Sequence, residues 1–202
     1  MCSGTCHLST IFKLIRQKNW AKVQRSMFLC KLMKKMPQRA TKSKSQASCF
    51  ILHYACQFRP PQNVVKSIFK SFPDAACIHD GDGRYALHVA CKYGCDPQVI
   101  KIIIDKNPDA VRQFDSKRRT PLHLVYMDYI FSCKLEWMKA NKMLLEVAKM
   151  LTAVAPQVVT EEDYKGLSAL EYGLIEELQF SSIILLQSTV ERYHHEIIKE
   201  TG

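Results

Sequence analysis

Leu87-His88-Val89-Ala90-Cys91 is the stretch that decides the fold, because nearly the same residues occur 35 positions earlier as Leu52-His53-Tyr54-Ala55-Cys56. Leu122-His123-Leu124-Val125 follows 35 positions later, and Leu170-Glu171-Tyr172-Gly173 follows 48 positions after that. The difference of 13 residues between the two intervals indicates one insertion, near residues 129–141. Self-similarity at a fixed period of this length is the signature of a stacked repeat protein.

Within one unit the apolar residues recur with a helical period. Two sets in the second unit lie at positions i, i+3 and i+4: Leu87, Ala90 and Cys91, then Val99, Ile102 and Ile103. Gly94 can end the first helix in the left-handed conformation, and Asp96-Pro97 can begin the second. Each unit is therefore predicted to be two antiparallel helices and a loop, which bury their apolar faces by stacking on the next unit.

Thr120-Pro121-Leu122-His123-Leu124 resembles the Thr-Pro-Leu-His-x-Ala motif of the ankyrin repeat family. The resemblance covers about residues 45–186 and implies an all-α, ankyrin-type solenoid of stacked antiparallel helix pairs with connecting loops. It also implies that Thr120 caps a helix whose first turn holds Pro121, and that one histidine per unit bridges backbone groups between repeats. These structural histidines are His53, His88 and His123.

The chain departs from the family pattern in three places. The period is 35 residues, against about 33 for the usual unit. The first unit has Arg59-Pro60-Pro61 where a helix-ending glycine is expected, and the last unit has Glu171 in place of histidine. We expect these departures to alter loop shape and to leave the architecture unchanged.

The domain organisation follows from the same register. We expect a basic N-terminal region of capping helices and linker at 1–44, then repeats at about 45–79, 80–114, 115–162 with the insertion and 163–186, and the end of a C-terminal capping helix at 187–202.

Positive charge is concentrated at the N-terminal end. The whole chain has a net charge of +10, but residues 1–73 carry 14 Lys and Arg residues and no acidic residue. Three interpretations stay open: a solvated face without a partner, a docking surface for an acidic protein, nucleic acid or anionic membrane, and an organelle import segment. The densest part of this basic patch is Lys31, Lys34, Lys35, Arg39, Lys42 and Lys44.

No catalytic motif stands out. The sequence has no Gly-rich phosphate loop, and neither of the hydrolase and metalloprotease motifs, Gly-x-Ser-x-Gly and His-Glu-x-x-His, occurs. We therefore expect a protein that is not an enzyme and has no cofactor or metal site. The nine cysteines do not predict a disulfide framework. In the absence of a secretory signal we expect a cytoplasmic or nuclear location, with organelle import as the alternative.

Partners of ankyrin repeats usually meet the loop tips and the exposed positions of the first helices. Basic loop tips favour an acidic surface, and aromatic and Arg residues carry most interface energy. The predicted function is a scaffold or adaptor that binds a protein partner as a monomer; the alternative is electrostatic binding to nucleic acid or an anionic membrane through the basic region. The apolar residues of the insertion either pack back on the stack, which we favour, or offer an anchor for a partner, for which Trp137 is the candidate. With Trp137 included, the candidate partner-binding residues carried over by register are Phe58, Arg84, Lys92, Tyr93, Lys117, Arg119, Met127, Trp137, Tyr164 and Lys165.

Overall fold

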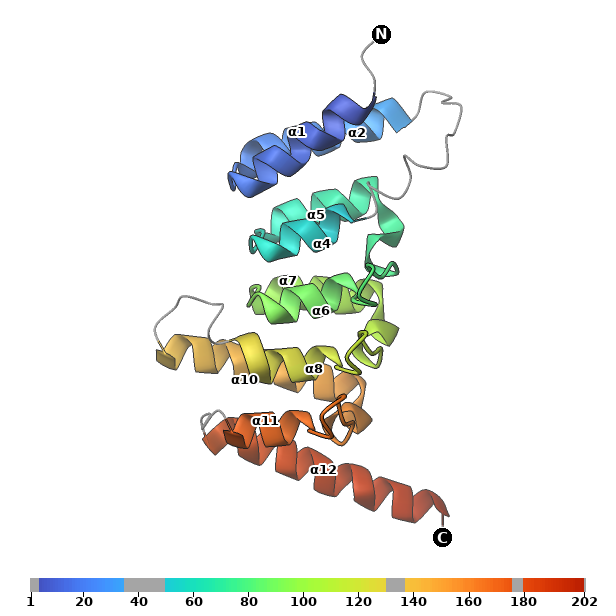
Figure 1. The fold of residues 1–202 in the computed structure, drawn as a ribbon, viewed down its shortest axis with the longest axis vertical. Helices are drawn as coiled ribbons and strands as arrows, with labels where there is room; N and C mark the ends of the chain where they lie inside the picture. Colours follow the sequence, from blue (N-terminus) through green and yellow to red (C-terminus); the bar gives the residue numbers. More distant parts are fainter. Residues whose placement is uncertain (1–3, 35–49, 130–136, 176–179, 202) are drawn as a thin grey trace.

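Paired helices form a stack along the whole described chain (Figure 1). The computed structural model describes residues 4–34, 50–129, 137–175 and 180–201. The inner column, on the side of the loops, consists of α1 (Gly4–Arg16), α4 (Ile51–Gln57), α6 (Ala86–Lys92), α8 (Pro121–Leu124) with the π-helical turn η3 (Val125–Tyr129), and α11 (Ala169–Ile175). The outer column consists of α2 (Trp20–Lys34), α5 (Gln62–Ser71), α7 (Pro97–Lys106), α10 (Trp137–Val154) and α12 (Phe180–Thr201).

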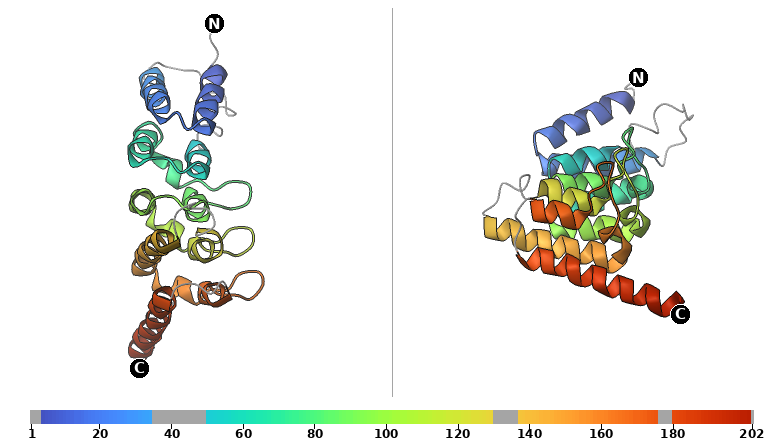
Figure 2. Two further views of the ribbon diagram at one scale, coloured as in Figure 1. Left: turned by 90° about the vertical axis from the view of Figure 1, so that its left-hand side faces the viewer. Right: turned by 60° about the horizontal axis from the view of Figure 1, so that its bottom comes forward.

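The connections between repeats also recur. Each of the middle outer helices is followed by a short 3-10 turn: η1 (Pro73–Ala76), η2 (Pro108–Val111) and η4 (Pro156–Val159). A loop then projects from the side of the stack before the next inner helix begins (Figure 2). In the described ranges the only extended pairing is two isolated bridges, His79 with Tyr85 and Glu162 with Ser168. The predicted all-α solenoid is confirmed.

Local sequence sets where the helices begin and end. Asp96 caps α7, since its side chain accepts a hydrogen bond of 2.9 Å from the Gln98 N–H, and Pro97 occupies the first turn. Gly94 ends α6 with a φ of 62°. The equivalent residue of the preceding repeat is Arg59, which takes the same left-handed conformation with a φ of 53°. The arginine therefore replaces the expected glycine without altering the helix end.

Apolar contacts between neighbouring repeats form one continuous core. Leu52, Leu87 and Leu122, the leading residues of the repeated motif, are fully buried. Burying one such side chain contributes about 1.5–3 kcal/mol. The core continues into the N-terminal helix pair through Ile11, Ile15, Val23 and Met27. The α1–α2 pair thus packs on the first repeat as one more unit of the stack.

The insertion lengthens an outer helix. Residues 130–136 lie outside the described part of the chain, but α10 has 18 residues where α7 has 10. Trp137 is the first residue of α10; the surroundings of its side chain, and with them its predicted role as an anchor, lie outside the described residues. Among the described helices, none combines the length and the apolar character that a membrane crossing requires.

Candidate partner-binding surface

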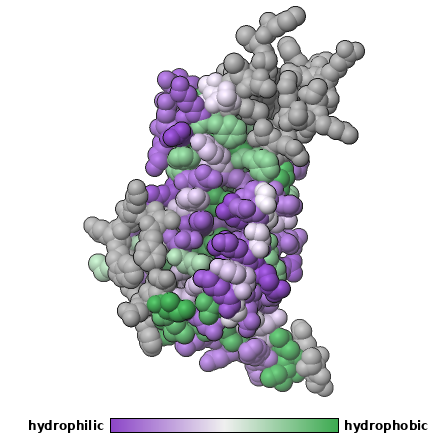
Figure 3. All heavy atoms as spheres, in the orientation of Figure 1, coloured by the Kyte–Doolittle hydropathy of each residue, from purple (hydrophilic) through white to green (hydrophobic). Residues whose placement is uncertain are grey.

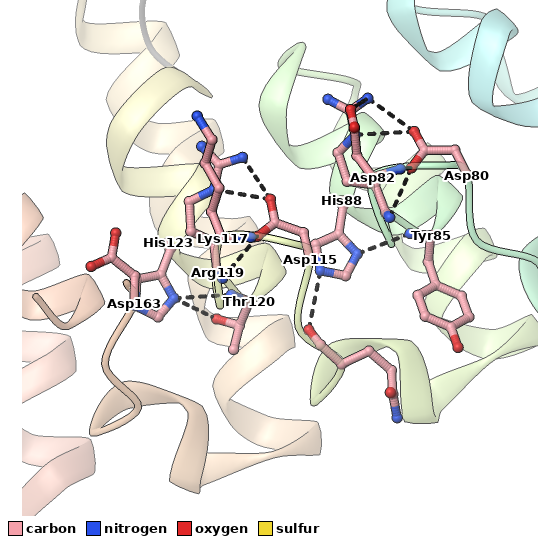
Figure 4. A network of polar contacts seen from close by, with 12 residues as sticks. Asp80, Asp82, Tyr85, His88, Asp115, Lys117, Arg119, Thr120, His123 and Asp163 are labelled. Carbon is pink, nitrogen blue, oxygen red and sulfur yellow. Dashed lines mark hydrogen bonds and ion pairs between the residues drawn. The ribbon is translucent and has the colours of Figure 1, made fainter. Parts of the chain in front are cut away.

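The buried histidines join each inner helix to the following loop. Nδ1 of His88 accepts a hydrogen bond from the Tyr85 N–H (3.2 Å), and Nε2 donates to the Gln113 carbonyl (3.1 Å; Figure 4). Nδ1 of His123 likewise accepts from the N–H of Thr120 (3.1 Å), the N-cap residue of α8, whose first residue is Pro121. This pattern requires a neutral ring with its proton on Nε2.

The same inter-repeat bond recurs at the other two histidines. Nε2 of His53 donates to the Arg84 carbonyl (2.9 Å), and Nε2 of His123 donates to the Leu167 carbonyl (3.2 Å). Burial lowers the pKa of all three imidazoles, that of His88 to about 4, because charging a ring inside the stack is unfavourable. These bonds fix the position of each loop relative to the helix before it.

Glu171 takes over half of this role in the last repeat. Its carboxylate accepts a hydrogen bond from the Ser168 N–H (2.6 Å), and the Ser168 hydroxyl oxygen accepts one from the Glu171 N–H (3.4 Å), which is a capping box. A carboxylate cannot donate, so Glu171 replaces only the accepting half of the histidine pattern.

One aspartate closes each loop from within. Oδ1 of Asp80 accepts the N–H groups of residues 82 and 84, and Oδ1 of Asp115 accepts those of residues 117 and 119, all at 2.9–3.0 Å. Oδ1 of Asp163 makes the same pair of bonds, at 2.7 and 3.3 Å. Burial alone raises the pKa of these carboxyls, but the hydrogen bonds to the ionised form outweigh it, so each pKa is lowered.

Arg119 belongs to the interior of its loop, which corrects the expectation that it is an exposed tip residue. Its guanidinium pairs with Oδ2 of Asp115 at 2.6 Å, and its side chain is only 11% exposed. Arg84 pairs with Asp80 and Asp82 in the preceding loop and is half-buried. In the last loop the residue equivalent to Arg119 is Leu167, and the Tyr172 hydroxyl donates a hydrogen bond to Asp163 in place of an arginine (2.8 Å). This position therefore supports loop structure.

Successive loops are bonded to one another through their backbones. The Ser116 N–H donates to the Asp82 carbonyl (2.8 Å), and the Tyr164 N–H donates to the Lys117 carbonyl (3.1 Å). The three loops therefore form a continuous row along one edge of the stack, as the left view of Figure 2 shows. Such a row is a rigid platform, because both its internal turns and its junctions are hydrogen-bonded.

A group of cations and rings lies at the tips of the second and third loops. The Lys117 and Lys165 ammonium groups lie 5.8 and 5.6 Å from the centre of the Tyr164 ring, which is 54% exposed. The Arg118 guanidinium lies 5.3 Å from the centre of the Phe114 ring, which is 37% exposed. Cations at these distances are attracted to ring faces. We call these five residues the loop-tip cluster.

Two members of the cluster, Phe114 and Arg118, are missing from the sequence prediction. Arg118 has a φ of 53°, and its equivalents in the neighbouring loops are Gly83 and Gly166, with φ values of 72° and 73°. The repeat register alone could have identified this arginine, because it stands where two sister units have glycine.

The inner helices present a second set of side chains. Phe58, Lys92 and Tyr93 are half-buried, and the Lys92 ammonium lies 5.9 Å from the Tyr93 ring centre. The Phe58 ring packs against Tyr54 (5.2 Å). Figure 3 views this face and shows hydrophilic residues over most of its middle. Met127 does not lie at an exposed helical position as expected: it falls in the π-helical turn η3 and is half-buried against the core.

The basic patch is described only in part. Lys31 and Lys34 lie in the last turns of α2, and Lys35, Arg39, Lys42 and Lys44 lie outside the described residues. Five other cations of the N-terminal helix pair and the turn between its helices are exposed: Lys13, Arg16, Lys18, Lys22 and Arg25.

Comparison with known proteins agrees with the geometry. The family model described as ankyrin repeats (3 copies) matches residues 52–135, which span the units with His53, His88 and His123. A search of curated proteins gives no significant match. The recurrent helix pairs, histidine bridges and projecting loops of the structure coincide with the matched segment. Residues 52–135 therefore carry the ankyrin repeats that the sequence motif predicted.

Proposed function

We propose that this chain is a non-catalytic scaffold that holds a protein partner against its loop row and inner helices. Ankyrin repeats generally mediate protein–protein interaction, and the family is typically non-catalytic. The observation that carries the proposal is the loop row itself: a hydrogen-bonded platform that exposes the Tyr164 ring and the cations beside it.

The chemistry of this surface suits a protein interface. Aromatic rings and arginines provide most of the energy at interface hot spots. Because the loops are already fixed by Asp115, Asp163 and the histidine bridges, a partner orders little backbone when it binds. The half-buried Tyr93 is the C-cap residue of α6, so a partner that lies along the inner helices would reach it.

The test is affinity capture from the cell of origin with the full chain and single variants. We expect Tyr164→Ala and Tyr93→Ala each to lose proteins that the unchanged chain retains. Lys66→Ala and Lys101→Ala change exposed residues of α5 and α7 on the outer column and serve as controls. Thermal unfolding verifies that every variant is folded. If the two tyrosine variants capture the same proteins as the lysine controls and the unchanged chain, the proposed surface is wrong.

A second candidate function is electrostatic binding to nucleic acid or an anionic membrane through the N-terminal region. The exposed cations of α1 and α2, in a segment of 73 residues without an acidic side chain, favour it. Binding to phosphates weakens steeply with salt, because bound counterions are released. Titration with single-stranded RNA and with phosphatidylserine vesicles, each at rising salt, tests this function. Salt-independent affinity, or none, would rule it out.

A further inference from the structure

We propose that the loop-tip cluster (Phe114, Lys117, Arg118, Tyr164 and Lys165) binds an acidic peptide segment of the partner, with Arg118 as its main contact. This inference rests on the proposed scaffold function and adds the chemistry of the partner. It names Arg118 as the main cationic contact, a residue that the sequence prediction omitted although it included the neighbouring Arg119.

The first argument is the balance of charge around the cluster. The carboxylates of the two loops that form the cluster, those of Asp115 and Asp163, are buried and engaged by backbone N–H groups, Arg119 and Tyr172. The exposed carboxylate of the adjoining first loop, Asp82, is paired with Arg84. No ion pair found in the described chain involves Lys117, Arg118 or Lys165. The loop design thus turns its negative charge inward and leaves three exposed cations outward. An anionic ligand would complement them.

The second argument is the backbone of Arg118. A side chain in the left-handed conformation is unfavourable, and the two sister loops avoid the problem with Gly83 and Gly166. Arg59 has the same φ at a helix end, so the conformation by itself does not mark a binding site. At Arg118 it holds an exposed cation at the tip of a loop, where backbone strain can serve ligand contact. The Arg118 side chain is exposed and, within the described chain, makes no ion pair and interacts only with the partly exposed Phe114 ring, so its charge is open to a ligand.

The third argument is the size of the cluster, which separates a peptide from other anions. Three cations are fewer than the roughly 6–10 phosphate contacts typical of nucleic-acid binding and the roughly 4–8 Lys or Arg residues of lipid-binding patches. They match a short run of Asp or Glu, whose carboxylates can form bidentate pairs with a guanidinium. The Tyr164 and Phe114 rings add apolar contact area for the rest of such a segment.

The fourth argument is preorganisation. The bond from the Tyr164 N–H to the Lys117 carbonyl holds the two tips side by side, and both lysines approach the same ring. A segment that runs along the loop row therefore meets the cations in fixed order. Little conformational entropy is lost from the protein on binding, which leaves more of the electrostatic attraction as affinity.

The test is fluorescence anisotropy with the full chain and a labelled peptide of alternating Glu and Ala. We expect Arg118→Gly to weaken binding about tenfold, as for the loss of one charge-assisted contact, and Lys117→Gln with Lys165→Gln to weaken it at least as much, because two cations are removed. The matched control, Lys66→Gln with Lys101→Gln, removes the same charge from the outer column and should change affinity less than about twofold. A Lys-Ala peptide should not bind.

Arg118→Gly also separates recognition from folding, because it should weaken peptide binding while raising the melting temperature. Equal effects of the loop and control variants would overturn the proposal. So would poly-U RNA or phosphatidylserine vesicles that bind more tightly than the peptide and depend on the same three cations. If the peptide fails but Tyr93→Ala still loses captured proteins, only the acidic assignment is wrong. If Tyr93→Ala also captures the same proteins as the unchanged chain, the proposed scaffold function is wrong as well.

Discussion

Acidification should destabilise this repeat stack well before any loop carboxylate is protonated. Burial lowers the pKa of His53, His88 and His123, and it lowers that of His88 to about 4. An unfolded chain has histidine pKa values near about 6.5, so between about pH 6.5 and about pH 4 it binds more protons than the folded chain. Stability is therefore complete above about pH 6.5 and is lost progressively as the pH falls through this window.

The magnitude can be worked out for His88. A shift from 6.5 to about 4 corresponds to a loss of about 2 kcal/mol at pH ~5 and of about 3 kcal/mol once the folded-state imidazole is itself protonated. The loop aspartates act elsewhere. Their pKa values are lowered from 3.8, so their stabilisation persists until the pH falls below about that value. The interval from about pH 6.5 to about pH 5 therefore reports chiefly on the three histidines.

Urea unfolding followed by circular dichroism at several pH values measures this effect, with His88→Gln as the comparison. Glutamine at this position can still accept the N-cap N–H but does not titrate. We expect the variant to be less stable at neutral pH, because the bond to the Gln113 carbonyl is lost or weakened. Between about pH 7.5 and about pH 5 its stability should fall by about 2 kcal/mol less than that of the unchanged chain. Parallel pH profiles for the two proteins would refute the assignment of a buried, neutral imidazole.

Three substitutions test the loop and core geometry by thermal or urea unfolding. Arg118→Gly should stabilise the chain by about 1 kcal/mol, since it relieves a left-handed side chain; a lower melting temperature would contradict the strain. Asp115→Asn should cost about 3 kcal/mol, because it leaves the 11% exposed Arg119 cation without its partner, and an unchanged urea midpoint would place that pair in solvent. Gly173→Ala should cost about 1–3 kcal/mol, because its added Cβ would lie 3.0 Å from Tyr126; a neutral effect would mean that this ring moves freely.

Much of the architecture could be predicted from the sequence because the repeat register carries it. The period of the Leu-His motif indicated stacked helix pairs, and Asp96-Pro97 indicated where α7 begins. The repeat register could not predict which of the two arginines of the second loop, Arg118 or Arg119, is exposed. Adjacent residues in a tight turn point in different directions, so Arg119 reaches back to Asp115 while Arg118 faces solvent. That difference depends on backbone torsion angles, which composition and spacing do not reveal.

The loops also show how one chain can keep its fold and vary its surface. The first residue of each loop is the same aspartate, at 80, 115 and 163, and its hydrogen bonds close the turn whatever stands between. The three residues that follow vary: Gly81-Asp82-Gly83, Ser116-Lys117-Arg118 and Tyr164-Lys165-Gly166. The first position differs in all three loops, two loops share a lysine at the second position, and two share a glycine at the third. Only the third residue after each aspartate (Gly83, Arg118 or Gly166) adopts a positive φ. Recognition can therefore change at the first two positions at little cost to stability. Arg118 occupies the third position, where a side chain lowers the stability of the fold and, in our proposal, adds a contact to the partner. Replacing this one residue therefore tests both effects.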